Sequence, residues 1–134
     1  MLSRDQLIKL AVDDYFIGCN TNNHEKVMST MSQDCIMRFP AATFRYEGHD
    51  ALSVHFTDFL SNFKIINFHD FTNIVDVKSQ SIVSYFKIHL TDHDDVEIKM
   101  ANCNIFHCDE NGLFNEIIIY NTAALDKGFQ EGNS

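Results

Sequence analysis

The second half of the chain alternates apolar and polar residues with a period of two, the pattern of β-strands. Four such stretches, joined by short polar turns, cover Ile65–Val77, Ser81–Thr91, Val96–Cys108 and Leu113–Thr122. Each is longer than the usual strand of about five to six residues. Long antiparallel strands that follow one another twist strongly, so they do not form a flat layer. This half of the chain therefore predicts a curved antiparallel sheet.

The last two stretches predict one hairpin, because Asn111-Gly112 between them is a strong turn signal. In an extended strand, alternate side chains share a face. One face of Val96–Cys108 then carries Ile98, Met100, Asn102, Asn104 and Phe106. An unpaired buried amide costs a few kcal/mol. Asn102 and Asn104 therefore either find partners inside the fold, where they satisfy each other or nearby backbone, or line a cavity.

The first half of the chain is mainly helical. Ser3 and Gln6 form a capping-box pattern, and apolar residues at helical spacing then predict a helix as far as about residues 18–20. A short helix over His24–Met31 and a strand over Asp34–Phe39 follow, and the strand ends at Pro40. Residues Asp50–Phe63 predict a third helix with one apolar stripe. Three helices ahead of a sheet indicate an α+β domain over residues 1–125, with a flexible tail over residues 126–134.

Composition narrows the classes of function. A net charge of −9 and a pI near 5.0 disfavour a nucleic-acid partner, which needs clustered Lys and Arg. No apolar run is long enough for a membrane span. The four cysteines form no C-x-x-C pair, which predicts reduced thiols and a cytoplasmic location. Asp92-His93-Asp94-Asp95 holds metal-ligand types but sits between two strands, so we expect a solvated turn and no metal site.

The order of these elements resembles the nuclear transport factor 2-like (NTF2-like) superfamily. Within it, the chain is similar to the SnoaL-like group, which includes ketosteroid isomerases, scytalone dehydratase-type enzymes and polyketide cyclases. The resemblance covers roughly residues 3 to 123. It rests on Tyr15-Phe16, on the segments 34–40 and 46–52, and on the turn 109–112 with Glu116-Ile117. It implies a cone in which three N-terminal helices pack in a strongly curved antiparallel sheet, a pocket on the concave face, and a homodimer through the outer face.

Two catalytic patterns of this group are incomplete here. The isomerases use a tyrosine, an aspartate base and a protonated aspartic acid, whose positions fall on Tyr15, Phe39 and Asn104. Phenylalanine cannot accept a proton, and asparagine only forms hydrogen bonds. The dehydratases carry an H-x-x-x-N pattern, which His69 and Asn73 match, but their further tyrosine and aspartate fall on Asn20 and Thr21. A spacing of four residues places His69 and Asn73 on one strand face.

These positions give a candidate site. His69 is the expected acid or base, because an imidazole titrates near neutrality; the alternative is a structural histidine. Tyr15 and Asn104 would polarise a ligand oxygen, although a buried tyrosine with one hydrogen-bond partner is the ordinary case. His55 fits either a packed histidine or the pocket wall. The expected ligand contacts are Phe39, His55, Asn73, Asn102, Phe106, Ile117 and Asn121.

The predicted function is the binding of a small hydrophobic molecule that bears a carbonyl or hydroxyl oxygen. One hypothesis adds proton-transfer catalysis (dehydration, isomerisation or cyclisation) with no cofactor. The other is a non-catalytic module that binds a ligand or a protein partner.

Overall fold

The computed structural model describes residues 1–122. Its helices are α1 (Arg4–Lys9), the π-helix η1 (Leu10–Phe16), α2 (Ile17–Asn20), α3 (His24–Met28) and α4 (His49–Asn62). Its strands are β1 (Met31–Phe39), β2 (Phe44–Glu47), β3 (Phe63–Asp76), β4 (Ser81–Asp92), β5 (Glu97–Cys108) and β6 (Phe114–Asn121). The predicted domain end at residue 125 and the predicted tail lie outside the described residues.

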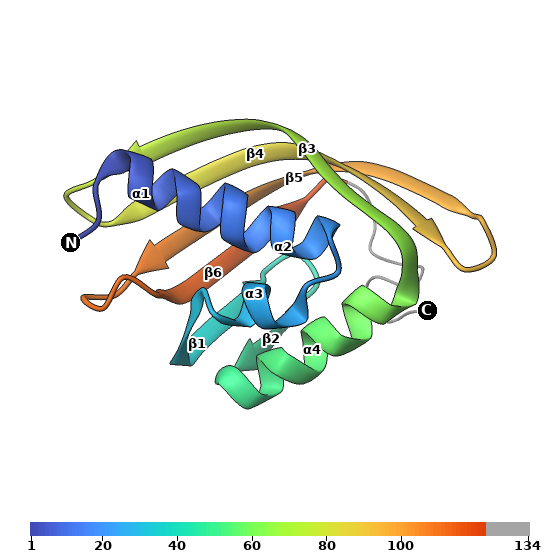
Figure 1. Ribbon diagram of the computed structural model, residues 1–134, viewed down its shortest axis with the longest axis horizontal. Helices are drawn as coiled ribbons and strands as arrows, with labels where there is room; N and C mark the ends of the chain where they lie inside the picture. Colours follow the sequence, from blue (N-terminus) through green and yellow to red (C-terminus); the bar gives the residue numbers. More distant parts are fainter. Residues whose placement is uncertain (123–134) are drawn as a thin grey trace.

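The strands form one curved sheet in the order β2-β1-β6-β5-β4-β3, and the helices lie against its concave side (Figure 1). The predicted α+β class and the antiparallel run from β3 to β6 are confirmed. The sheet as a whole is mixed, because β1 pairs with β6 in parallel. Alternation of residue types shows which side chains share a face, but it carries no information on the direction of a distant neighbour.

The N-terminal helix begins as predicted, with the reciprocal capping box of Ser3 and Gln6. It does not continue as one α-helix, because its middle widens into η1. The backbone N–H of Ile17 donates to the carbonyl of Val12, five residues back. The adjacent residues Tyr15 and Phe16 are both buried, with 3% and 0% of their surfaces exposed.

The β5–β6 hairpin turns where the sequence predicts it. The Asp109 carboxylate accepts hydrogen bonds from the backbone N–H groups of Asn111 and Leu113. Gly112 has a φ of +76°, a conformation that favours glycine. The turn sets the register of the two strands, so that Asn102 lies opposite Asn121 and Asn104 lies opposite Ile119.

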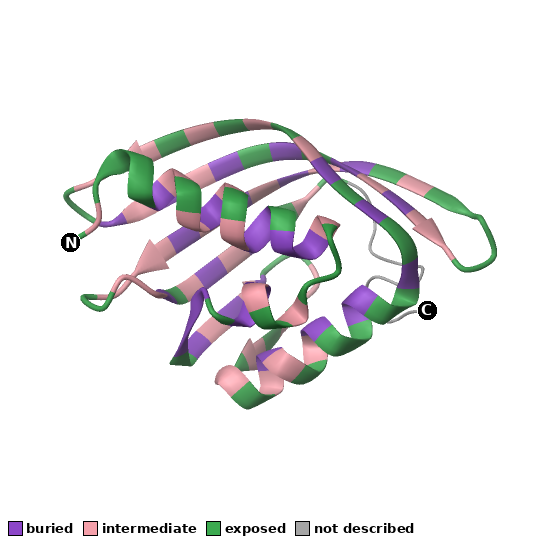
Figure 2. Ribbon diagram, viewed as in Figure 1, coloured by how far each residue is buried: buried purple, intermediate pink, exposed green. Residues whose placement is uncertain are grey.

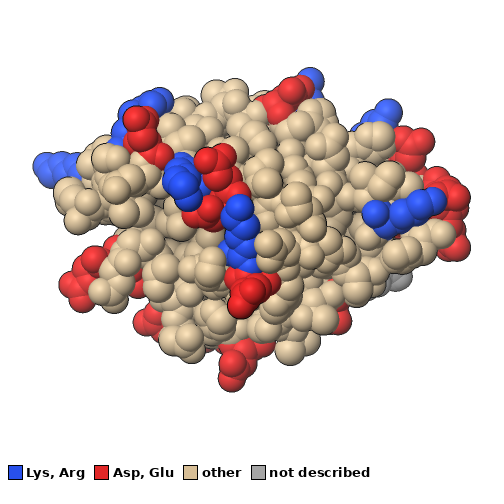
Figure 3. Space-filling model, viewed as in Figure 1, with Lys and Arg blue, Asp and Glu red and all other residues tan. Residues whose placement is uncertain are grey.

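The core lies between the helices and the concave face, where the buried positions gather (Figure 2). Its largest fully buried side chains include Phe16, Phe86, Phe106 and Phe114. Charges of both signs are scattered over the face that carries the helices, without a basic patch there (Figure 3). Within residues 1–122, no helix is long and apolar enough to cross a membrane.

Candidate functional site

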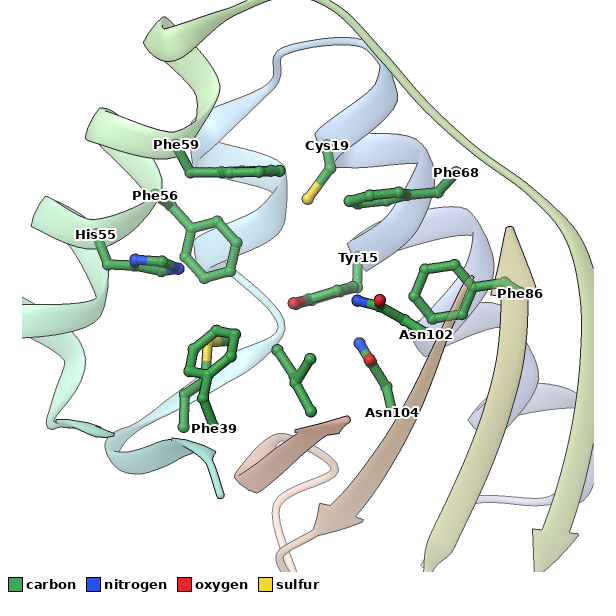
Figure 4. Close-up of a pocket in the computed structure, with 12 residues that line it drawn as sticks. Tyr15, Cys19, Phe39, His55, Phe56, Phe59, Phe68, Phe86, Asn102 and Asn104 are labelled. Carbon is green, nitrogen blue, oxygen red and sulfur yellow. The ribbon is translucent and has the colours of Figure 1, made fainter. Parts of the chain in front are cut away.

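A small cavity lies between α4, the N-terminal helices and the concave face of the sheet (Figure 4). The centre of a water molecule can occupy about 30 Å³ of it, which is room for one or two waters. Most of its wall is apolar. The lining residues are Tyr15, Cys19, Met37, Phe39, His55, Phe56, Phe59, Phe68, Phe86, Asn102, Asn104 and Ile119.

Tyr15 reaches the cavity from η1. Its ring is held edge-on between Phe16, Phe56 and Phe106, at centroid distances of 5.0, 5.9 and 5.2 Å. Its hydroxyl forms no hydrogen bond with any residue of the described range, and its oxygen points into the cavity (Figure 4). Burial raises the pKa of Tyr15 well above its usual value, so the hydroxyl stays protonated and can donate.

Asn102 and Asn104 occupy successive inward positions on β5 and are 3% and 2% exposed. The two alternatives for this pair are both partly realised. The Oδ1 of Asn102 accepts a hydrogen bond of 2.7 Å from Nδ2 of Asn121, so this amide has one partner inside the fold. The Oδ1 of Asn104 is buried with no partner among residues 1–122. Both amides also line the cavity, with their nitrogens on the side of the Tyr15 hydroxyl (Figure 4).

His55 enters the cavity from α4, across from the two amides (Figure 4). Its ring stacks on Tyr46, with centroids 4.3 Å apart, and contacts Phe39 edge-on at 6.0 Å. Burial lowers the pKa of His55 to about 4, because a charged imidazole is poorly solvated there. The ring is therefore neutral at pH 7 and can accept a proton.

His69 does not lie in the cavity. It pairs with Lys87 of β4 and is half exposed, on the convex face beside a shallow hollow shared with His89 and Lys99. The prediction that His69 and Asn73 share a strand face is therefore wrong. Tyr15, Asn104 and His69 do not converge.

The cause is a bulge in β3. The pairing register shifts between His69 and Thr72, and Asp70 has a φ of +58°, which aspartate tolerates better than most residues. Phe68 lines the cavity and Phe71 packs on Phe16 at 4.8 Å, so two residues separate successive inward rings instead of one. The bulge thus changes which alternate side chains of β3 point inward, so that Phe68 and Phe71 both face the interior.

Of the other predicted ligand contacts, some line the cavity and some lie behind its wall. Phe39 lines the cavity. Asn73 instead accepts a 2.7 Å hydrogen bond from the Ser84 hydroxyl, and Phe106 and Ile117 are fully buried outside the lining. Asn121 contacts the cavity only through Asn102.

Part of the wall was not predicted from the sequence. The omitted residues are Cys19, Met37, Phe56, Phe59, Phe68, Phe86 and Ile119. The apolar stripe of the third predicted helix already contained Phe56 and Phe59 beside His55, and this stripe was the available signal. Burial raises the pKa of Cys19 far above its usual value, so its thiol is a wall atom and not a reactive thiolate.

No group of three His, Cys, Asp or Glu side chains in the described part of the chain could hold a metal ion. The segment 92–95 is a turn, as predicted. The Asp92 carboxylate accepts from the backbone N–H groups of Asp94 and Val96, and Asp95 pairs with Lys64 at 2.6 Å.

The cavity thus combines a protonated phenol, two amides and a neutral imidazole inside a wall of rings. Such donors can bind and polarise a carbonyl oxygen, and the imidazole can accept a proton from a neighbouring carbon or hydroxyl. A cavity of roughly 150 Å³ accommodates benzene, so a ring-sized ligand requires movement of the wall. Phe59 and Phe68, which lie parallel at 6.2 Å, belong to that wall.

No protein-family model matches the sequence, and no curated protein matches it. Solved structures do match the fold. AusH from Aspergillus nidulans aligns with a TM-score of 0.79 at 14% identity, over 96% of this chain and 91% of that one. The BvnE pinacolase from Penicillium brevicompactum aligns with a TM-score of 0.76 at 17% identity, over 89% and 87% of the two chains.

A candidate SnoaL-like polyketide cyclase from Shewanella denitrificans aligns with a TM-score of 0.77 at 12% identity. That alignment covers 88% of this chain and 91% of the other. At such identities the likeness concerns the fold, and it agrees with the curved sheet and the helices described above. The chain has the same fold as these solved structures.

Proposed function

We propose that this chain binds a small hydrophobic molecule through a carbonyl or hydroxyl oxygen, and that it catalyses proton transfer on that molecule without a cofactor. One observation carries the proposal: polar side chains without full hydrogen bonding surround a cavity whose wall is otherwise apolar. Buried polar groups normally have partners, and each exception calls for an explanation. A ligand oxygen would supply the missing partners.

The roles follow from the chemistry of each group. Tyr15 and the amides of Asn102 and Asn104 donate to the ligand oxygen and stabilise negative charge as it develops. His55 takes the role that was predicted for His69, because His55 lines the cavity and His69 does not. A pKa of about 4 suits a base aided by such donors, since the aspartate base of ketosteroid isomerase has a pKa of about 4.6. The expected reactions are isomerisation, dehydration or cyclisation through an enol.

Binding is tested by native mass spectrometry of the purified protein, which should carry a co-purified small molecule.

Catalysis is tested with cyclopentanone in heavy water, because proton transfer replaces the hydrogens beside the carbonyl with deuterium, which NMR detects. The wild-type protein should accelerate this exchange. His55→Gln should abolish the acceleration but keep ketone binding, whereas His69→Gln should leave both unchanged. Exchange that persists in His55→Gln would refute the assignment of the base.

A second candidate function rests on the convex face of the sheet. Ile74, Tyr85 and Tyr120 are 67%, 52% and 45% exposed. Tyr85 and Tyr120 both pair with Cys103, so they lie in one row across the strands, and contiguous exposed apolar groups mark interaction surfaces. We propose a homodimer through this face, with or without catalysis in the cavity. Analytical ultracentrifugation should find a dimer that Tyr85→Lys dissociates, while Lys78→Glu in the β3–β4 turn leaves it intact.

A cytoplasmic location remains part of the proposal. It is supported by the four cysteines, two of which (Cys19 and Cys35) are buried and all of which are free thiols. Fractionation of cells that express the chain with a tag would test this location.

A further inference from the structure

Asn102 and Asn121 form a cross-strand pair at the end of the β5–β6 hairpin. The two residues lie directly opposite each other in the register. The Nδ2 of Asn121 donates to the Oδ1 of Asn102 at 2.7 Å. Only Asn102 lines the cavity, so Asn121 acts on the site from behind it.

The direction of this hydrogen bond is set by a third group. The Nδ2 of Asn121 also lies 3.9 Å from the sulfur of Met100. A thioether sulfur is a weak acceptor and has no proton to donate, so it favours the NH2 end of the amide over the oxygen end. With the nitrogen of Asn121 placed there, Asn102 must present its oxygen to Asn121. The Asn102 NH2 group is then left facing the cavity (Figure 4).

This NH2 group has no hydrogen-bond partner among residues 1–122. Together with the protonated Tyr15 hydroxyl, it gives the cavity two unpaired donors, and the unpaired Oδ1 of Asn104 is an acceptor in the same cavity. A carbonyl oxygen, which only accepts, satisfies two such donors at once. An alcohol accepts as well, but its own proton also needs an acceptor, and the Asn102 amide offers none while its oxygen is turned toward Asn121.

We propose that Asn121 is a positioning residue that sets the hydrogen-bond polarity of the cavity, and that it thereby makes the site selective for carbonyl ligands over alcohols. This inference rests on the proposed function for its ligand class. It adds that specificity is decided by a residue outside the cavity wall. The contacts from Met100 to Asn121 and from Asn121 to Asn102 orient the Asn102 amide.

The inference predicts that one substitution inverts the amide. In Asn121→Asp, the carboxylate can only accept, so Asn102 must turn its NH2 group outward to donate to it. The Oδ1 of Asn102 then faces the cavity, where it accepts from the Tyr15 hydroxyl or from an alcohol. Carbonyl binding thus loses two donors, and alcohol binding gains an acceptor. In Asn121→Leu, a matched control of similar size, no partner fixes Asn102 in either direction.

The experiment compares the three proteins in two measurements. The first follows the side-chain NH2 resonances of Asn102 by NMR without ligand. In Asn121→Asp these resonances should shift downfield and exchange with solvent at least tenfold more slowly than in wild type. The second measures the affinities of cyclopentanone and cyclopentanol. The ketone-to-alcohol affinity ratio should fall at least tenfold in Asn121→Asp and by less in Asn121→Leu, where both affinities drop.

The two measurements separate the inference from the function on which it rests. Unchanged Asn102 resonances in a folded Asn121→Asp protein would overturn the positioning role, whatever binds. Shifted resonances with no binding of either compound to wild type would keep the positioning role and reject the proposed ligand class. An equal fall of the affinity ratio in the Asp and Leu variants would overturn the polarity argument, since loss of packing alone would then suffice. Near-ultraviolet circular dichroism and thermal unfolding establish that each variant is folded.

Discussion

Phenylalanine lines both ends of the protein interior, but one end is fully packed and the other holds a cavity. At the closed end, Phe16, Phe106 and Phe114 are fully buried, and rings meet rings, with Phe106 and Phe114 stacked at 4.5 Å. At the cavity end, Phe39, Phe59 and Phe68 face Asn102, Asn104 and His55. The closed end is a packed core, whereas the cavity end keeps space beside polar groups that lack full hydrogen bonding.

The difference shows that the amides, and not the phenylalanines, distinguish a pocket from a core. Collapse of the rings onto the amides would bury donors and an acceptor permanently without partners, which is costly. The space that remains admits water or a ligand oxygen to these groups. The closed end holds η1 and the sheet in place, and so fixes the geometry of Tyr15 at the boundary between the two ends.

The largest expected effect tests the closed end. Phe106→Ala should lower the free energy of unfolding by about 3–5 kcal/mol, because the space left by a fully buried ring cannot collapse. Phe59→Ala at the cavity end should cost less, since the ring is 6% exposed and borders space that water can enter. Urea unfolding of both variants measures the difference. Equal losses would mean that the two ends are packed alike.

The next effect is the acid sensitivity of the cavity end. The pKa of His55 is about 4 in the folded protein against 6.5 when unfolded. Between these values the unfolded chain binds more protons, so stability falls as the pH is lowered from 6.5 to 4. The contribution reaches roughly 3 kcal/mol, since one pKa unit is about 1.4 kcal/mol.

Urea unfolding from pH 7 to 4.5 measures this slope. His55→Gln should flatten it, and His89→Gln on the convex face should not. If the two variants kept the same slope, the assignment to His55 would fail.

A smaller effect separates the two kinds of inward amide. Asn104→Leu should raise the free energy of unfolding by about 1–3 kcal/mol, because it removes a buried oxygen without a partner, and it should abolish ligand binding. Asn73→Leu should lower the free energy of unfolding, because it leaves the hydroxyl of the fully buried Ser84 unpaired, and it should leave ligand binding intact. Thermal unfolding and ketone titration measure both. A destabilised Asn104→Leu protein would show that this amide is structural.

The smallest effect concerns His69. Because this side chain is half exposed on the convex face, His69→Ala should change the free energy of unfolding by no more than about 0.5 kcal/mol. Ketone affinity should stay within twofold of wild type. A tenfold loss of affinity would show that His69, although on the convex face, takes part in ligand binding.

Much of the fold could be predicted from local patterns. The capping box, the Asn-Gly hairpin and the antiparallel run from β3 to β6 depend on neighbours in the sequence, and the structure contains all of them. The amide pair of β5 was predicted to face inward for the same reason. The parallel β1–β6 pairing could not be predicted this way, because about eighty residues separate its partners and nothing local records their direction.

Part of the candidate site was predicted wrongly for a specific physical reason. The alternation rule assumes a regular strand, and one extra residue at Asp70 reverses which side chains face inward. His69 matched a catalytic pattern and still lies outside. His55 matched no catalytic pattern, yet the regular helix α4 carries it to the cavity, and the helical stripe had already placed it near the interior.

The π-helix η1 has a consequence for how the length of this chain can change. A π-turn holds one more residue than the α-turn it replaces, so deletion of one residue between Leu10 and Phe16 would convert it to α-helix. The helix before it would then turn by about 100° relative to the part that carries Tyr15 and Cys19. Leu7 would leave the core, and Leu2 would lose its paired hydrogen bonds with Gln80. Homologues with regular helices here would therefore need a different first turn, and an alignment would show a one-residue gap at η1.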